Sequence, residues 1–202
     1  MKLYLRPGKQ IYIGKINTSE IELRDLVKAW LAISFAFAMV LRHGIGLSFY
    51  QVFIISAVTV GTGFLLHELG HKFVAQRYGC FAEFRSFDQM LILAVFMSFF
   101  GFVFAAPGAV MIAGKVDKVK NGIISAAGPI INIVLALLFL SISFMFPGGM
   151  LKILAFYGYF INSWLALFNM IPVWNLDGAK VLKWNKKIYG VIVAVALLLL
   201  FL

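Results

Sequence analysis

Charge is scarce in this chain of 202 residues, because only 13% of the residues are charged while 62% are hydrophobic. Soluble domains keep about a quarter of their residues charged. The composition therefore excludes a water-soluble globular protein and predicts a protein that has the lipid bilayer as its solvent. A single cysteine, Cys80, excludes an intrachain disulfide. The first 25 residues contain no signal-peptide core, so we expect the mature protein to keep its N-terminus.

Acidic residues are also few. Eight aspartates and glutamates stand against 18 lysines and arginines, which gives a formal net charge of +10. In a soluble protein this excess would suggest a nucleic-acid partner, but here the basic residues lie between apolar runs, where they report membrane topology. No basic stripe is interleaved with exposed aromatic residues, so we expect no nucleic-acid partner.

Long apolar runs dominate the rest of the chain. They occupy residues 26–41, 49–66, 91–113, 122–146, 151–171 and 188–202. A spanning helix needs about 20 apolar residues, so the expected fold is an all-α polytopic membrane protein with five to six transmembrane helices. We expect a single domain at 1–202, in which an extended cytoplasmic segment at 1–25, with a turn at Pro7-Gly8, precedes a transmembrane core at 26–202. Ser19 and Glu22 match a capping box at the start of the first helix.

The third apolar run has basic residues on both sides. They are Lys72, Arg77 and Arg85 before it, and Lys115, Lys118 and Lys120 after it. Positive loops face the cytoplasm, so both ends of the run share one face only if the run enters the membrane and returns. The pattern predicts a re-entrant partial helix followed by a short strand at "PGAVMI", and five crossings. An ordinary span with an unusual charge distribution is the alternative.

The second apolar run ends in "HELGH" at residues 67–71. His67 and His71 are four residues apart and share one helix face, and Glu68 lies beside them. This is the H-E-x-x-H pattern of metallopeptidases, in which two imidazoles bind zinc and the glutamate is general base and acid. The alternative is a hydrated helix end at the membrane interface. Ionisable groups at membrane depth are costly and usually functional, which favours the metal site.

A catalytic zinc site takes three protein ligands, so a third is needed. Asp177 follows an apolar helix in "NMIPVWNLDGAK" and is expected at the same side of the membrane as His71. The residues alone leave three roles open for Asp177: a zinc ligand, a helix N-cap, or the ion-pair partner of Lys180.

Three motifs together resemble the site-2 protease family of intramembrane zinc metalloproteases. They are "HELGH" at 67–71, "GPIIN" at 128–132 and "NMIPVWNLDG" at 169–178. The resemblance implies that His67, His71 and Asp177 bind one catalytic Zn²⁺ and that Glu68 is the catalytic base. It implies catalytic roles for Asn169 and Asn132, for which a helix-to-helix hydrogen bond is the alternative.

The same resemblance implies that Gly128 permits close packing beside the site, and that the "PGAVMI" strand lies next to the active site. Many relatives carry PDZ or CBS domains, for which this chain has no room.

The expected function is therefore hydrolysis of peptide bonds within or near transmembrane segments of other membrane proteins. The expected location is the cell membrane, with the active site toward the cytoplasmic side. Two alternatives remain: a membrane-anchored zinc peptidase that acts on soluble or lipidated peptides, and a non-catalytic transporter or scaffold with a metal site. The sequence does not determine the oligomeric state.

Overall fold

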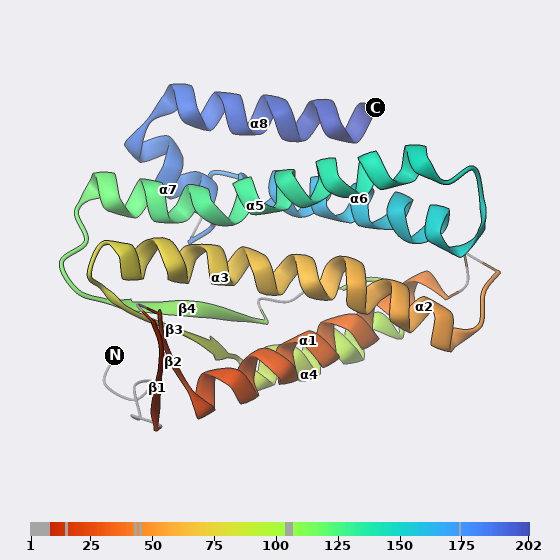
Figure 1. The fold of residues 1–202 in the computed structure, drawn as a ribbon, viewed down its shortest axis with the longest axis horizontal. Coiled ribbons are helices and arrows are strands. Elements are labelled where there is room, and N and C mark those ends of the chain that lie inside the picture. The colour runs from red at the N-terminus through yellow and green to blue at the C-terminus, as the bar shows by residue number, and fades with distance from the viewer. Residues whose placement is uncertain (1–8, 15, 43, 45, 104–106, 174) are drawn as a thin grey trace. The chain divides into compact units, whose positions relative to one another are not determined.

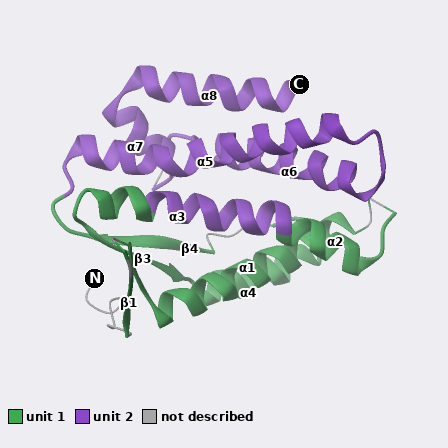
Figure 2. Cartoon of the chain, viewed as in Figure 1, with its two compact units in different colours: residues 1–57, 72–115 green, residues 58–71, 116–202 purple. Residues whose placement is uncertain are grey.

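The computed structural model describes residues 9–14, 16–42, 44, 46–103, 107–173 and 175–202, so the predicted turn at Pro7-Gly8 lies outside the described residues. The described part is mostly helical, as predicted, with two small sheets of two strands each (Figure 1). The chain forms two compact units, which consist of residues 1–57 with 72–115 and residues 58–71 with 116–202 (Figure 2).

The first unit begins with a hairpin of β1 (Gln10–Ile13) and β2 (Ile16–Ser19). It continues with α1 (Glu20–Leu41), α2 (Phe49–Ser56), β3 (Phe81–Ser86), α4 (Asp88–Ser98) and β4 (Gly108–Ala113). Helix α1 packs against α2, α4 and β3. Strands β3 and β4 are antiparallel, with Phe81 opposite Ala113 and Ser86 opposite Gly108.

Only one of the two hydrogen bonds of the predicted capping box is present at the start of α1. Ser19 is the N-cap, as predicted, and its hydroxyl accepts a hydrogen bond from the backbone N–H of Glu22 at 3.2 Å. The carboxylate of Glu22 instead accepts bonds from Lys72 Nζ at 2.5 Å and from Thr18 Oγ1 at 2.7 Å. Lys72 is only 2% exposed, and a buried cation needs a charged partner. Glu22 supplies it, which is why the predicted return of this side chain to the N-cap is wrong.

Arg85 is buried as well and pairs with Glu83. Lys72 and Arg85 are thus neutralised inside the protein. The charge argument for re-entry therefore depends on the other basic residues.

The predicted partial helix and strand are present in the first unit. Helix α4 has 11 residues, about 16 Å of helix, whereas a bilayer core is about 30 Å thick. The backbone N–H of Phe87 donates to Pro107 O at 3.0 Å, so the chain returns next to the point at which it left. Helix α4 by itself is therefore too short to cross a membrane.

The second unit contains the first part of α3 together with α5 (Lys118–Met145), α6 (Gly149–Asn169), α7 (Asp177–Trp184) and α8 (Lys186–Phe201). Helix α5 packs against α6, α7 and α8, and α6 also packs against α8 (Figure 1). One core cluster combines Ala126, Met170, Val181 and Ile192. Because these residues come from α5, the end of α6, α7 and α8, the cluster fixes α7 against the neighbouring helices.

Three helices are long and apolar enough to span a membrane among the described residues. They are Phe49–Arg77, Lys118–Met145 and Gly149–Asn169. The first consists of α2, a π-helical turn at Ala57–Gly61 and α3 (Thr62–Arg77). It ends before Gly79, whose φ of 75° is the left-handed conformation typical of a helix C-terminal cap. Helix α1 carries several charges in its first turns, and α8 has only 16 residues. The predicted count of five to six spans is therefore not confirmed, while a membrane protein is.

Candidate metal centre

Helix α3 brings its two histidines together, as the spacing predicts. The Nε2 atoms of His67 and His71 lie 3.1 Å apart, and the two rings stand nearly perpendicular at 87°. Both side chains are buried, at 4% and 8% exposure. Two buried imidazoles that point their nitrogens at one spot form the start of a metal site.

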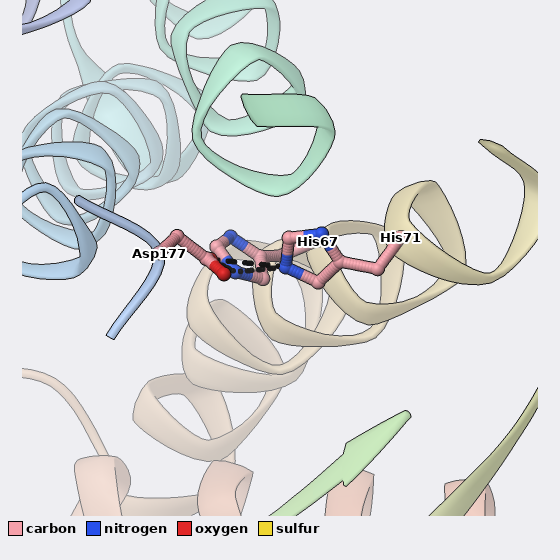
Figure 3. Close-up of side chains that lie close together, drawn as sticks. All are labelled: His67, His71 and Asp177. Carbon is pink, nitrogen blue, oxygen red and sulfur yellow. Dashed lines mark hydrogen bonds and ion pairs between the residues drawn. The ribbon is translucent and has the colours of Figure 1, made fainter. Parts of the chain in front are cut away.

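Asp177 completes the cluster from α7 (Figure 3). Its Oδ2 atom lies 3.2 Å from His67 Nε2 and 3.0 Å from His71 Nε2. Leu176 and not Asp177 is the N-cap of α7, so the helix-cap alternative is wrong. The Lys180 alternative is also present, because Lys180 Nζ lies 3.7 Å from the other carboxylate oxygen. One oxygen of the carboxylate thus faces both histidines, and the other faces Lys180.

Two glycines position the helix that carries Asp177. A Cβ atom on Gly178 would lie 2.1 Å from the backbone oxygen of Met170, so the start of α7 can contact the end of α6 only with glycine there. A Cβ atom on Gly122 would lie 2.3 Å from Trp184 Cβ, so glycine on α5 makes room for the end of α7. Close packing at both ends of α7 fixes the position of its first residue.

The outer ring nitrogens determine which way each imidazole is polarised. His71 Nδ1 lies 2.7 Å from the carbonyl oxygen of Ile124, and His67 Nδ1 lies 2.6 Å from Oδ1 of Asn132. Both oxygens accept, so each Nδ1 donates its hydrogen and each neutral ring presents a lone pair at Nε2. Metal-ligating histidines are typically held in this way by a hydrogen bond at the other nitrogen.

The donor set fits zinc. Bonds of about 2.0–2.1 Å in a tetrahedral site place neighbouring ligand atoms about 3.3–3.4 Å apart, close to the 3.0–3.2 Å separations of the three donor atoms here. Two lone pairs and a carboxylate repel one another at such distances unless a cation lies among them. His67, His71 and Asp177 could therefore hold one metal ion, and two imidazoles with one carboxylate are a zinc donor set.

Gly128 faces the same point from α5. A Cβ atom there would lie 2.5 Å from His67 Nε2 and 2.6 Å from His71 Nε2. The close packing expected at Gly128 is therefore confirmed, and the absent side chain leaves room at the metal-facing nitrogens themselves.

The other predicted site residues occupy different positions. Glu68 follows His67 in α3 and is half-buried. Asn169 is half-buried at the end of α6, where its Nδ2 donates to Leu165 O at 2.9 Å in its own helix. The structure thus directs the amide donor of Asn169 to its own helix, and the catalytic role of Asn169 stays a prediction.

Asn132 forms the helix-to-helix hydrogen bonds given above as the alternative to catalysis. Its Nδ2 donates to Gly63 O at 3.2 Å and to Asn162 Oδ1 at 3.0 Å, while its Oδ1 accepts from His67. Asn162 was not predicted as a site residue, although an asparagine inside an apolar helix indicates a polar contact between helices.

These features define a metal-binding membrane protein with a zinc donor set. The chain is 42% identical over 177 residues to "Putative zinc metalloprotease MJ0611" of Methanocaldococcus jannaschii, across 86% of this chain and 90% of that relative. It is 25% identical over 155 residues to "Zinc metalloprotease MJ0392" of the same organism, across 76% of this chain and 41% of that relative. No protein-family profile and no solved structure matches the chain. The chain belongs to a family of zinc metalloproteases, and zinc is its metal.

Proposed function

We propose that this chain is an intramembrane zinc metalloprotease of the site-2 type, which hydrolyses peptide bonds within or near transmembrane segments of other membrane proteins. One observation carries the proposal. The buried donor atoms of His67, His71 and Asp177 lie within 3.2 Å of one another, and both histidines belong to a helix that is apolar and long enough to span a membrane. A hydrolytic site on such a helix would lie at membrane depth, where the transmembrane segments of other proteins can reach it.

The ligand set supports a catalytic metal. Structural zinc sites are closed by four protein ligands, whereas catalytic sites use three and leave one position open. Zinc in such a site supplies Lewis acidity, which polarises a carbonyl and lowers the pKa of water to about 7. Glu68 accepts the proton of the attacking water and passes it to the leaving amine. Asn169 stabilises the developing negative charge or positions the substrate, for which its amide turns away from Leu165 O.

A substrate helix must unwind before its peptide bonds can be attacked, because every backbone group inside it is already hydrogen-bonded. An unwound segment can be held by adding as a strand to a sheet. We assign this role to β4, which contains most of the "PGAVMI" segment, and we expect substrates with helix-weakening residues near the cleaved bond to react fastest.

The outer edge of β3 is occupied by side chains, so we assign strand addition to β4. Gln76 Nε2 donates to Ala82 O at 3.0 Å, and the backbone N–H of Phe84 donates to Glu22 Oε1 at 2.9 Å. The backbone N–H of Ser86 donates to Asp25 Oδ2 at 3.3 Å. Residues 82, 84 and 86 alternate along one edge, so side chains occupy that edge along most of the strand.

The chain resides in the cell membrane, crosses it five times with its N-terminus inside, and re-enters at residues 91–113. We assign the active site to the cytoplasmic side by the positive-inside rule, because Lys118, Lys183, Lys186 and Lys187 are exposed. Transmembrane protein segments are the substrates, and one zinc ion serves each chain.

The test compares Glu68→Gln with wild type in detergent or liposomes, with Glu20→Gln as the matched control because Glu20 is exposed at the start of α1. Zinc content and cleavage are measured with a synthetic transmembrane substrate and with a soluble peptide of the same cleaved sequence. The proposal expects Glu68→Gln to keep zinc and to lose cleavage by at least about 100-fold. Preferred cleavage of the soluble peptide would favour a membrane-anchored peptidase. Zinc binding without any cleavage by wild type would favour a scaffold.

A further inference from the structure

Asn162 is a buried polar residue in the middle of the apolar helix α6. Its exposed fraction is 0%, and its Nδ2 donates to Gly158 O one turn earlier at 2.9 Å. Its Oδ1 accepts from Asn132 Nδ2 on α5 at 3.0 Å. Burying an amide in an apolar helix is costly unless both ends are bonded, and here both ends are.

The direction of every hydrogen bond in this chain of contacts is fixed. Gly158 O can only accept, so Asn162 must point its NH₂ group toward it and its oxygen toward Asn132. Asn132 must then point its own NH₂ group at Asn162, and Gly63 O, which also can only accept, requires the same orientation. The oxygen of Asn132 is therefore left for His67 Nδ1, and the lone pair of His67 Nε2 faces His71 and Asp177.

A second observation indicates that the position of Asn162 is built into the fold. A Cβ atom on Gly63 would lie 2.4 Å from Asn162 Oδ1. Gly63 precedes His67 by about one turn of α3, and its carbonyl accepts from the same Asn132 amide. One glycine thus both leaves space for Asn162 and helps to orient Asn132.

We propose that Asn162 is a positioning residue of the metal centre: it orients the amide of Asn132, which in turn holds His67 in the tautomer and ring orientation that bind zinc. The proposal rests on the metal site assigned above. Asn162 touches neither metal nor substrate, so its effect reaches the site only through Asn132. His71 has a separate anchor at Ile124 O and does not depend on this chain of contacts.

The experiment measures zinc retention without substrate. Wild type, Asn162→Leu and Asn132→Leu are loaded with zinc and challenged with a chelator, and the cobalt-substituted proteins are compared by visible absorption, which reports coordination geometry. Loss of an outer partner of a metal ligand weakens binding by about 10- to 100-fold, and we expect at least about 10-fold for Asn162→Leu. Ser163→Ala is the matched control, because Ser163 is equally buried in α6 and bonds only to Tyr159 O of its own helix in the described contacts.

The double variant separates positioning from packing. If Asn162 acts through Asn132, Asn162→Leu adds nothing in the Asn132→Leu background, whereas independent packing defects add. Gly63→Ala provides a second variant that displaces Asn162 Oδ1 without removing a polar atom, and we expect the same loss of zinc and the same change in the cobalt spectrum. If Asn162→Leu does not fold, Gly63→Ala carries the comparison.

Wild-type zinc retention and cobalt spectra in Asn162→Leu or Gly63→Ala would overturn the inference, as would additive losses in the double variant. Failure of the proposed metal site looks different: His67→Ala would then retain zinc as wild type does. The two outcomes are distinguishable in one series of measurements.

Discussion

A Cβ atom on Gly128 would lie 2.5 Å from Nε2 of His67, the nitrogen that faces the metal position. Real Cβ contacts are not this short. A methyl group added at position 128 must therefore displace the imidazole of His67 or shift helix α5, to which Gly128 belongs. The metal centre therefore requires the space that glycine leaves at position 128.

Gly128→Ala is accordingly expected to weaken zinc binding by at least about 100-fold, the upper end of the range for substitutions around metal ligands. Alanine is a better helix former than glycine, so the helix itself should persist. Chelator competition measures the zinc affinity. Gly190→Ala is the control, because nothing lies within 4 Å of a Cβ atom there. Equal zinc affinity in both variants would contradict the account.

Gly178→Ala tests how α7 is positioned. The added Cβ atom would lie 2.1 Å from the backbone oxygen of Met170, and backbone atoms cannot move aside as a flexible side chain can. We expect the free energy of unfolding to fall by more than about 2 kcal/mol, together with weakened zinc binding because Asp177 moves with α7.

The unfolding midpoint in detergent gives the stability of this variant. Gly148→Ala is its control, since a Cβ atom at Gly148 meets nothing within 4 Å. A stable Gly178→Ala protein with full zinc content would show that α7 has another way to approach α6.

The buried ion pair of Glu22 and Lys72 is expected to behave as a unit. Glu22→Gln leaves the Lys72 ammonium buried without its counter-charge, and removing one partner of such a pair costs about 3–5 kcal/mol. The double variant Glu22→Gln/Lys72→Met removes both charges and keeps an oxygen for the backbone N–H of Phe84. It should recover most of the lost stability.

Thermal unfolding of the two single variants and the double variant gives the coupling free energy. Lys118→Met, at an exposed position, controls for the loss of a lysine. Additive effects of the two substitutions would contradict the pairing.

The contact between Lys28 and Asp88 ties α1 to the start of α4, with 2.5 Å between Nζ and Oδ1. The hydrogen bond from Lys28 holds the pKa of Asp88 below its ordinary value. A lowered carboxyl pKa stabilises the fold above the unfolded value of about 3.9, and this contribution disappears as the pH falls through the folded pKa.

Because the Asp88 side chain is 65% exposed, the effect of Asp88→Asn should be below about 1 kcal/mol at pH 7. It should vanish in strong acid and shrink in high salt. Unfolding midpoints of wild type and variant across this pH range measure it, and a difference that grows toward acid would contradict the sign.

The sequence predicted which side chains gather at the candidate metal site better than it predicted the contacts that hold them there. His67 and His71 follow from helical spacing, and the resemblance selected Asp177. Charge and length predicted a partial helix followed by a strand, and α4 and β4 are present, while re-entry into the membrane stays a prediction. Asn162 was missed because its partner Asn132 belongs to α5 and comes beside it only when α5 and α6 pack together.

Glu22 illustrates the opposite error. The local pattern Ser19–Glu22 predicts a reciprocal cap, and the local half of it is correct. Lys72, 50 residues away, lies buried beside Glu22 and requires its charge, so a long-range ion pair takes precedence over a local hydrogen bond. A local sequence pattern reports on residues that are neighbours in the chain. It carries no information about an ion pair with a residue far away in the sequence.

The central claim is that one zinc ion is held by two histidines of α3 and by Asp177. The most direct measurement is the zinc affinity of Asp177→Ala by chelator competition, beside Asp117→Ala, which removes an exposed aspartate that caps α5. The account predicts one zinc per chain in wild type and in Asp117→Ala, and an affinity at least about 100-fold weaker in Asp177→Ala. Zinc bound by Asp177→Ala as tightly as by wild type would contradict it.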